Sequence, residues 1–257
     1  MAPNELAITI QFTTVPKLFE EINAAIGDAL IVTDVSQQDY TNIVNERDRR
    51  RRRFRFKRYN ECQKLIVVIP TEAHELLHLP LYGRISAAVF QMGLGFEWVS
   101  TGSTTRRSFL NEDESEGDSS GRPRNPPGRR WPTLVIEAGY SRTLESLRRD
   151  VKWWFSASDH QVKIILLVHF DFSSEDIIIE KWQVEQNETE GLEPSRSQLI
   201  TISRGPDTDA VNSVSGGPLR LDFSLLFLRA AGQGEGDVVL SASELQQLAE
   251  MARETEI

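Results

Sequence analysis

The sequence predicts an α/β fold in which helices flank a central mixed sheet, and three observations carry this prediction. The chain has 257 residues, of which 39% are hydrophobic and 26% charged, a composition typical of globular proteins. Residues 131–170 read as strand, amphipathic helix and strand, a pattern that favours parallel pairing with a right-handed crossover. Shorter apolar or alternating segments on both sides of this unit predict further strands.

Residues 1–63 are expected to form an N-terminal extension that includes a basic segment at 47–58. Within it, alternation of apolar and polar residues predicts strands, whereas helical spacing with Pro16 in a first turn and Gly27 at a stop predicts a helix. The expected elements are a strand at Leu6–Phe12, a helix at Val15–Ile26, a strand at Ala29–Val35 and a helix at Ser36–Glu46.

Residues 64–257 are expected to form the main α/β core. Thr71 and Ser141 are expected to cap helices, Pro80 is expected to interrupt or kink one, and residues 111–130 read as a loop because they contain no hydrophobic residue. The expected strands are Lys64–Pro70, Phe96–Ser100, Trp131–Glu137, Val162–Phe170, Ile177–Val184, Gln198–Ser203 and Leu219–Leu228, and the expected helices are 72–92, 142–156 and Ser241–Glu254.

Three features bear on the expected location of the protein in the cell: apolar runs, the first residues and the cysteine count. The longest strongly apolar run, Ile164–Val168, is far shorter than the roughly 20 residues of a membrane helix. The first residues do not resemble a secretory signal, and the single cysteine, Cys62, cannot form an internal disulfide. We therefore expect no membrane partner and an intracellular location, in the cytoplasm or the nucleus.

The net charge of −9 hides a basic segment whose own charge is +8. Such a segment is typical of a nucleic-acid contact, a nuclear-import signal or an anionic partner, although a solvated helix end without a partner is the alternative. Phe54, Phe56 and Tyr59 lie between the charges and could stack on bases or pin the segment to the core. The candidate phosphate-binding residues are Arg49, Arg50, Arg51, Arg52, Arg53, Arg55, Lys57 and Arg58.

Glu137 ends an apolar strand, where a carboxylate is costly to bury unless it is paired or bound to metal. It is therefore either a surface acid where the strand leaves the sheet or a metal ligand. In the second case the carbonyl of Ala138 could complete the coordination, and Asp118 is the candidate for a second carboxylate. Asp118 could equally be an ordinary acid of a polar loop.

A second motif, His74-Glu75-Leu-Leu-His78, matches the H-E-x-x-H pattern that places two imidazoles on one helical face to bind zinc, with the glutamate as general base. No third ligand is evident from the sequence, and Pro80 follows closely. Three interpretations stay open: a zinc metallopeptidase, a packed or surface histidine pair, and a supporting role near a nuclease site in which Glu75 contributes.

Several motifs, in order, resemble those of fungal members of the restriction-endonuclease-like PD-(D/E)XK superfamily, which are related to bacterial Uma2-type predicted endonucleases. The resemblance runs from about Ile69 to Trp182. The segments that carry it are Pro70-Thr-Glu-Ala-His-Glu-Leu-Leu-His78, Gly102-Ser-Thr-Thr-Arg106, Gly117-Asp-Ser-Ser-Gly-Arg-Pro-Arg124, Trp131-Pro-Thr-Leu-Val-Ile-Glu-Ala-Gly-Tyr-Ser141, Leu147-Arg-Arg-Asp-Val-Lys-Trp-Trp154 and Val162-Lys-Ile-Ile-Leu-Leu167.

The resemblance implies a nuclease, a hydrolase whose catalytic acids meet at one sheet edge and use Mg²⁺ or Mn²⁺ to cleave DNA or RNA. Asp118 matches the first acid and Glu137 the second, but Gly117 replaces the usual proline and Gly139 stands where the lysine is expected. The implied substitutes for that lysine are Lys152 and Lys163.

Because neither lysine is well placed along the chain, weak or absent turnover is expected, and a non-catalytic nucleic-acid or protein interaction module on the same fold is the main alternative. The choice between DNA and RNA stays open. A homodimer is also possible.

Overall fold

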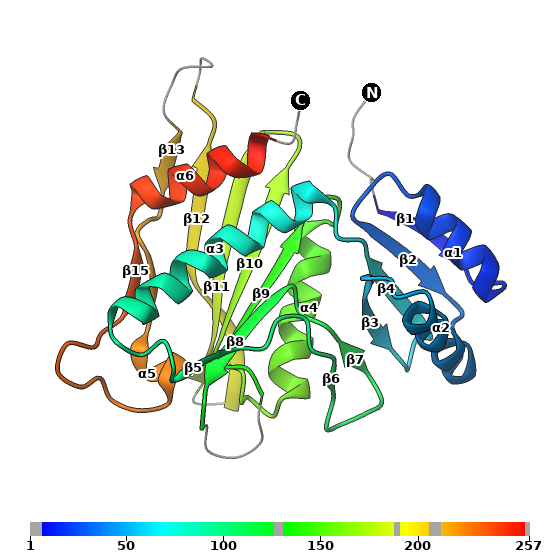
Figure 1. Ribbon diagram of the computed structural model, residues 1–257, viewed down its shortest axis with the longest axis horizontal. Coiled ribbons are helices and arrows are strands. Elements are labelled where there is room, and N and C mark those ends of the chain that lie inside the picture. Colours follow the sequence, from blue (N-terminus) through cyan, green and yellow to red (C-terminus); the bar gives the residue numbers. More distant parts are fainter. Residues whose placement is uncertain (1–6, 126–130, 188–190, 206–211, 255–257) are drawn as a thin grey trace.

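The computed structural model describes residues 7–125, 131–187, 191–205 and 212–254, which form two large sheets and a short ribbon, with helices packed against the sheets (Figure 1). The predicted α/β class, with a mixed sheet flanked by helices, is confirmed. No helix in these ranges is both long and apolar enough to span a membrane.

The N-terminal sheet has six strands and carries two helices on one face (Figure 1). The first helix begins at Val15 as expected, after Thr14, whose hydroxyl accepts a hydrogen bond from the Lys17 N–H. The second begins at Gln37, one residue later than expected, because Ser36 is its cap and accepts a hydrogen bond from the Asp39 N–H. The strands, in spatial order, are β1 (Ile8–Gln11), β2 (Ala29–Thr33), β4 (Lys64–Val68), β3 (Arg55–Tyr59), β7 (Glu114–Ser115) and β6 (Arg106–Arg107), and the helices are α1 (Val15–Ala24) and α2 (Gln37–Arg49).

The second sheet has seven strands, and its centre is the predicted β-α-β unit. β9 (Leu134–Gly139) pairs in parallel with β10 (Ile164–Asp171), and α4 (Leu144–Ala157) makes the crossover. The spatial order is β13 (Ser213–Ser215), β12 (Gly191–Ser203), β11 (Asp176–Asn187), β10, β9, β8 (Ser119–Pro123) and β5 (Trp98–Ser100). All the other neighbours in this sheet are antiparallel, so the sheet is mixed.

Helices cover both faces of the seven-stranded sheet. α3 (Glu72–Gln91) and α6 (Ala242–Arg253) lie across one face, and α4 lies on the other (Figure 1). Successive strand residues point to opposite faces, so Leu134 and Ile136 of β9 belong to the core under α3 while Val135 packs with α4. The same alternation directs the side chain of Glu137 toward α4.

Several sequence-based expectations differ from the structure. α3 runs through Pro80 without ending, because its buried residues Leu77, Leu81 and Ile85 hold the helix on the core against a cost of about 3 kcal/mol for an internal proline. Residues 111–130, expected to be a loop, contain β7 and β8. The two serines of β8 are buried and hydrogen-bonded, Ser119 to His78 and Ser120 to Thr101.

The third difference lies in the expected strand Leu219–Leu228, which divides into β14 (Leu219–Leu221) and α5 (Phe223–Phe227); β14 pairs with β15 (Val238–Leu240). Ser141 does not cap α4 either: Thr143 accepts the hydrogen bond from the Ser146 N–H. The expected boundary between residues 63 and 64 falls in the turn between β3 and β4, which pair along their whole length, so the two segments share one sheet.

Candidate active site

β3 supplies the positive charges of the site through the period of a strand. Arg55, Lys57 and Tyr59 point toward the seven-stranded sheet and α4, and each contacts a carboxylate from that part of the molecule. Phe56 and Arg58 point the other way: Phe56 joins the core beneath α2, and the Arg58 guanidinium lies over the Tyr40 ring, 5.0 Å from its centroid. The alternating sequence of β3 therefore divides its basic residues between two environments.

The first half of the site surrounds Lys57, whose side chain is only 1% exposed. Its Nζ atom lies 2.6 Å from Glu137 Oε1 and 3.2 Å from Asp150 Oδ2. Asp150, on α4, also accepts hydrogen bonds from Arg142 Nη1 at 2.7 Å and from the Tyr59 hydroxyl at 2.6 Å. Two carboxylates and two cations thus balance each other in the interior.

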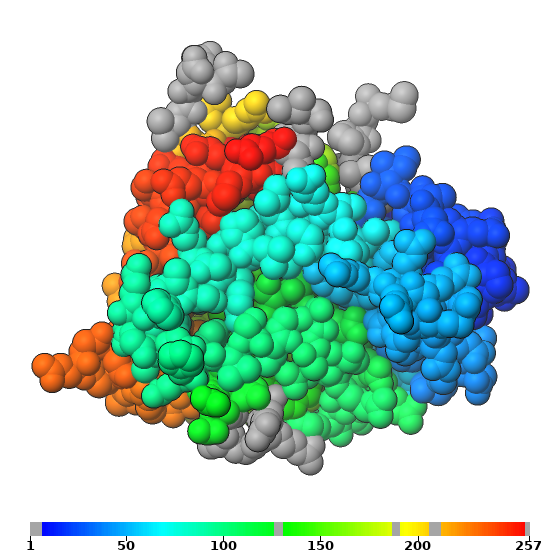
Figure 2. Space-filling view, in the orientation of Figure 1, coloured from blue at the N-terminus to red at the C-terminus, as the bar shows by residue number. Residues whose placement is uncertain are grey.

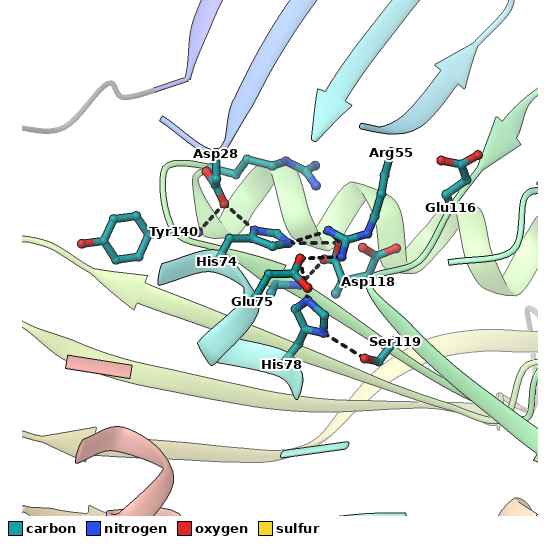
Figure 3. A network of polar contacts seen from close by, with 12 residues as sticks. Asp28, Arg55, His74, Glu75, His78, Glu116, Asp118, Ser119 and Tyr140 are labelled. Atoms are coloured by element: carbon teal, nitrogen blue, oxygen red, sulfur yellow. Dashed lines mark hydrogen bonds and ion pairs between the residues drawn. The ribbon is translucent and has the colours of Figure 1, made fainter. Parts of the chain in front are cut away.

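The second half surrounds His74 on α3. Its Nδ1 lies 2.6 Å from Asp28 Oδ2 and its Nε2 lies 3.1 Å from Asp118 Oδ1, so the ring bridges two buried carboxylates (Figure 3). Asp28, which precedes β2, also accepts hydrogen bonds from the backbone N–H of Tyr140 and Ser141. Asp118 Oδ2 accepts a hydrogen bond of 2.7 Å from the Ala138 N–H, which joins the two halves.

His78 and Glu75 lie one turn apart on the same helix. His78 Nδ1 lies 2.8 Å from Ser119 Oγ, and His78 Nε2 lies 3.4 Å from Glu75 Oε1 (Figure 3). Arg55 reaches across from β3, with Nη2 at 2.5 Å from Glu75 and Nη1 at 3.2 Å from Asp118. One ligating atom each from His74, His78 and Asp118 lie within 4.8 Å of one another, so this group could hold a metal ion.

Burial and charge together shift the pKa values of the site. Burial, with Asp118 and Asp150 nearby, raises the pKa of Glu137 to about 7 despite the opposing effect of Lys57. Burial alone would lower the pKa of His74, but Asp118 and Asp28 raise it to about 9. Burial would raise the pKa of Asp118, yet His74 and Arg55 hold it well below its ordinary range. Carboxylates with different protonation behaviour therefore lie side by side.

A cleft of about 580 Å³ opens beside the second half of the site. Arg55 and Glu75 belong both to the cleft wall and to the buried cluster, so the cleft leads to the cluster. Figure 2 shows the blue N-terminal region in contact with the cyan and green segments on one face of the molecule. The residues that line the cleft are Arg47, Asp48, Arg52, Arg53, Phe54, Arg55, Pro70, Glu75, Ser103 and Glu116.

The acids predicted from the sequence are brought together, but the two substitute lysines are not. Asp118 precedes β8 and stands opposite Glu137 of β9, because the next pair in the register is Ser119 with Ile136. Lys152 is exposed on α4, and Lys163 Nζ donates to the His160 carbonyl. Lys57 occupies the position beside Glu137 instead.

The residues of the basic segment lie in several different environments, which the sequence does not predict. Arg49 and Arg50 both pair with Glu46, and Arg51 is exposed. Lys57 and Arg58 are buried, so they do not form part of an exposed basic surface, and Arg55 reaches that surface only through the cleft. Among the candidate phosphate-binding residues, Arg52, Arg53 and Arg55 line the cleft.

Asp28, Arg142 and Asp150 belong to the cluster but were not singled out from the sequence. Asp28 and Asp150 meet partners from distant parts of the chain, and Arg142 is bound to Asp150, eight positions later. Asp150 does lie in one of the segments that carry the resemblance, but that segment does not indicate its partner Lys57. The alternation of Arg55, Lys57 and Tyr59 was a usable signal, because a strand with three polar residues on one face must place that face against a polar partner or solvent.

One observation indicates that the cluster could hold a divalent cation. Glu137 Oε2 is buried and accepts no hydrogen bond from any residue that the structure describes. A buried carboxylate oxygen without a partner is costly, and coordination to an ion would satisfy it. Ala138 meets Asp118 through its N–H, and the structure shows no role for its carbonyl in the cluster.

Comparisons with protein-family models and with curated proteins find no match. Four chains match among solved structures. One of them is described as "a putative nuclease belonging to DUF820 from Anabaena variabilis"; it is 11% identical, with a TM-score of 0.42, and the match covers 76% of this chain and 90% of that chain. At this identity and TM-score, the chemistry of this chain has to be argued from its own residues.

Proposed function

We propose that the chain is a metal-dependent phosphodiesterase that hydrolyses DNA or RNA. The observation that carries the proposal is the meeting of two acids and a lysine from three separate strand regions. Lys57 pairs with Glu137, Asp118 accepts a hydrogen bond from the N–H of the next residue, Ala138, and Asp118 also contacts Arg55, which lines the cleft. Two acids and a cation are the groups that phosphodiester hydrolysis with a bound ion requires.

Asp118 and Glu137 would hold the ion, Mg²⁺ or Mn²⁺, with the Ala138 carbonyl as a further ligand in this proposal. When bound, such an ion activates water and stabilises negative charge at the phosphate. Lys57 places a positive charge beside Glu137, and therefore close to the proposed ion site. Glu137, with its pKa near 7, can exchange a proton at neutral pH.

The cleft supports nucleic acid as the partner. Arg52 and Arg53 form no ion pair with any described carboxylate. Arg52 donates one hydrogen bond to Asn23 Oδ1 at 3.1 Å, and its other N–H groups and those of Arg53 are left for phosphate oxygens. Contacts of this kind supply sequence-independent affinity that weakens with salt.

A non-catalytic nucleic-acid or protein interaction module is the second candidate, and one observation favours it: the side chains of Lys57 and Glu137 are 1% and 0% exposed. In that case the cleft binds its partner and the buried charges only stabilise the fold. A zinc peptidase is not favoured, because Glu75, the general base that it would need, is paired with Arg55.

The test is cleavage of plasmid DNA and of total RNA by the pure protein in Mg²⁺ or Mn²⁺. Glu137→Gln removes the charge without changing the volume and is expected to abolish cleavage. Glu145→Gln, on the exposed surface of α4, is the matched control and should cleave like the parent. Cleavage that persists undiminished in Glu137→Gln would show that the site is assigned wrongly, and binding without cleavage in the parent would support the second candidate.

A further inference from the structure

The proposed function leaves the H-E-x-x-H motif of α3 without a role, although its two histidines meet Asp118. His74 and His78 are both fully buried. Their spacing of four residues places both rings on one helical face, and the ring centroids lie 5.4 Å apart. The Nε2 atom of His78 is buried, and Glu75 Oε1 lies 3.4 Å from it without forming a well-aligned hydrogen bond.

The Nδ1 atoms of both imidazoles have hydrogen-bond partners of the kind that orient metal-binding histidines. Asp28 holds Nδ1 of His74 at 2.6 Å, and Ser119 holds Nδ1 of His78 at 2.8 Å. Such partners orient the rings, so the Nε2 atoms face the interior of the cluster. With Asp118, the protein offers two imidazoles and one carboxylate to a common point.

A positive charge already stands at that point. Arg55 Nη1 lies 3.3 Å from His74 Nε2 and 3.2 Å from Asp118 Oδ1, while Nη2 is anchored by Glu75 (Figure 3). The guanidinium therefore contacts two of the three groups that a metal ion would use. It also lines the cleft, so a path leads outward to the surface where Arg52 and Arg53 lie.

We infer that His74, His78 and Asp118 form a site for a first-row transition metal, Zn²⁺ above all, and that Arg55 acts as a built-in cation that fills this site until it moves out into the cleft. Imidazole ligands suit zinc, whereas Mg²⁺ prefers oxygen ligands. Three protein ligands leave one position open on a tetrahedral ion.

This inference deepens the proposed function because it concerns the same cluster and shares Asp118, but it is measured without any substrate. Once Arg55 has moved out of the metal site, its guanidinium could pair with a phosphate group in the cleft. Metal binding and the binding of an anionic partner would then be linked. Loss of cleavage and loss of zinc binding are separate measurements, so the two proposals fail separately.

The experiment is calorimetric titration of the chelator-treated protein with ZnCl₂, and with MgCl₂ for comparison. The parent is expected to bind one zinc ion weakly, and Arg55→Gln is expected to bind it roughly tenfold or more tightly, because a competing positive charge has gone. Arg53→Gln, which removes a charge from the same cleft but not from the cluster, is the matched control and should bind like the parent.

A second substitution identifies the ligands. In the Arg55→Gln background, His78→Gln is expected to lower zinc affinity by roughly 100-fold, whereas His160→Gln, outside the cluster, should not change it. If Arg55→Gln does not fold, Arg55→Lys replaces it, because one ammonium cannot contact both Glu75 and Asp118 as the guanidinium does, and a smaller gain in affinity is then expected. Equal zinc affinity in the parent and the Arg55 variant, zinc binding that is indifferent to His78, or equal affinity for Mg²⁺ would overturn the inference.

Discussion

Lys57 Nζ lies 2.6 Å from Glu137 Oε1, although 80 positions separate the two residues in the chain. The contact joins β3 of the N-terminal sheet to β9 of the seven-stranded sheet. Both side chains are buried, and Asp150 approaches the same ammonium from α4. A single lysine therefore links three elements, and the N-terminal region is part of the site rather than an appendage.

Removing this lysine should destabilise the fold. Lys57→Met keeps much of the volume but leaves Glu137 and Asp150 without a shared cation, so the free energy of unfolding is expected to fall by about 3–5 kcal/mol. Urea denaturation measures this, with Lys152→Met on the exposed face of α4 as control, for which a change within about 0.5 kcal/mol is expected. Similar values for the two variants would contradict a structural role for the pair.

The position of Lys57 also predicts which lysines are dispensable for chemistry. If the protein cleaves nucleic acid, Lys152→Met and Lys163→Met should both retain the parental rate, because neither side chain lies beside Glu137. Plasmid and RNA cleavage assays under identical metal conditions provide the measurement. A clear loss of rate in either variant, with unchanged stability, would mean that the catalytic cation is not Lys57.

Gly139 should not tolerate a side chain. A Cβ atom at this position would come within 2.8 Å of Leu147 Cδ1, so α4 packs directly on the strand where the resemblance leads one to expect a lysine. Gly139→Ala is expected to cost about 1–3 kcal/mol in unfolding free energy. Gly83→Ala, in α3 with no atom near the added methyl, should instead stabilise the protein by about 0.5–1 kcal/mol. Thermal or urea unfolding of both variants checks this, and an unaffected Gly139→Ala would mean that α4 shifts freely.

Asp150 should govern part of the stability at acid pH. Burial would raise the pKa of Asp150, but Arg142 and Lys57 outweigh it and lower the pKa from 3.8 to about 2. Because the folded-state pKa lies below the ordinary value, the contribution is fully present well above pH 3.8 and is lost as the pH falls through about 2. The difference in unfolding free energy between the parent and Asp150→Asn is therefore expected to shrink as the pH falls from 3.8 through about 2. A difference that grows on acidification would contradict the assignment.

Nucleic-acid binding should depend on the arginines of the cleft more than on those of the helix end. The double variant Arg52→Ser with Arg53→Ser is expected to weaken binding and to reduce the slope of log affinity against log salt by about 0.7–0.9 for each phosphate that the protein no longer neutralises. Arg49→Ser with Arg50→Ser removes the same charge, but both of these side chains are already paired with Glu46, so a smaller effect is expected. Fluorescence anisotropy at several salt concentrations distinguishes the pairs, and equal effects of the two double variants would favour a diffuse basic surface over a cleft.

Much of the fold followed from local patterns. The parallel unit of β9, α4 and β10 was predicted because apolar runs and a helical period are properties of neighbouring residues, and hydrophobic burial acts on them directly. Residues 111–130 were expected to be a loop because the prediction depends on local apolar patterns, and these residues have none. Their buried side chains, including Asp118 and Ser119, are polar, and only their partners on α3 and β9 reveal why they lie inside.

The sequence by itself determined the acids Asp118 and Glu137 as candidates, the histidine pair of α3 and the presence of a basic segment. Only the tertiary structure decided that Lys57 serves Glu137, that Arg55 lies against the histidine cluster, and that Asp28 holds His74 in place. The physical reason is that a buried charge is tolerable only beside an opposite charge or a hydrogen-bond partner. Those partners come from distant segments, and folding alone brings them together.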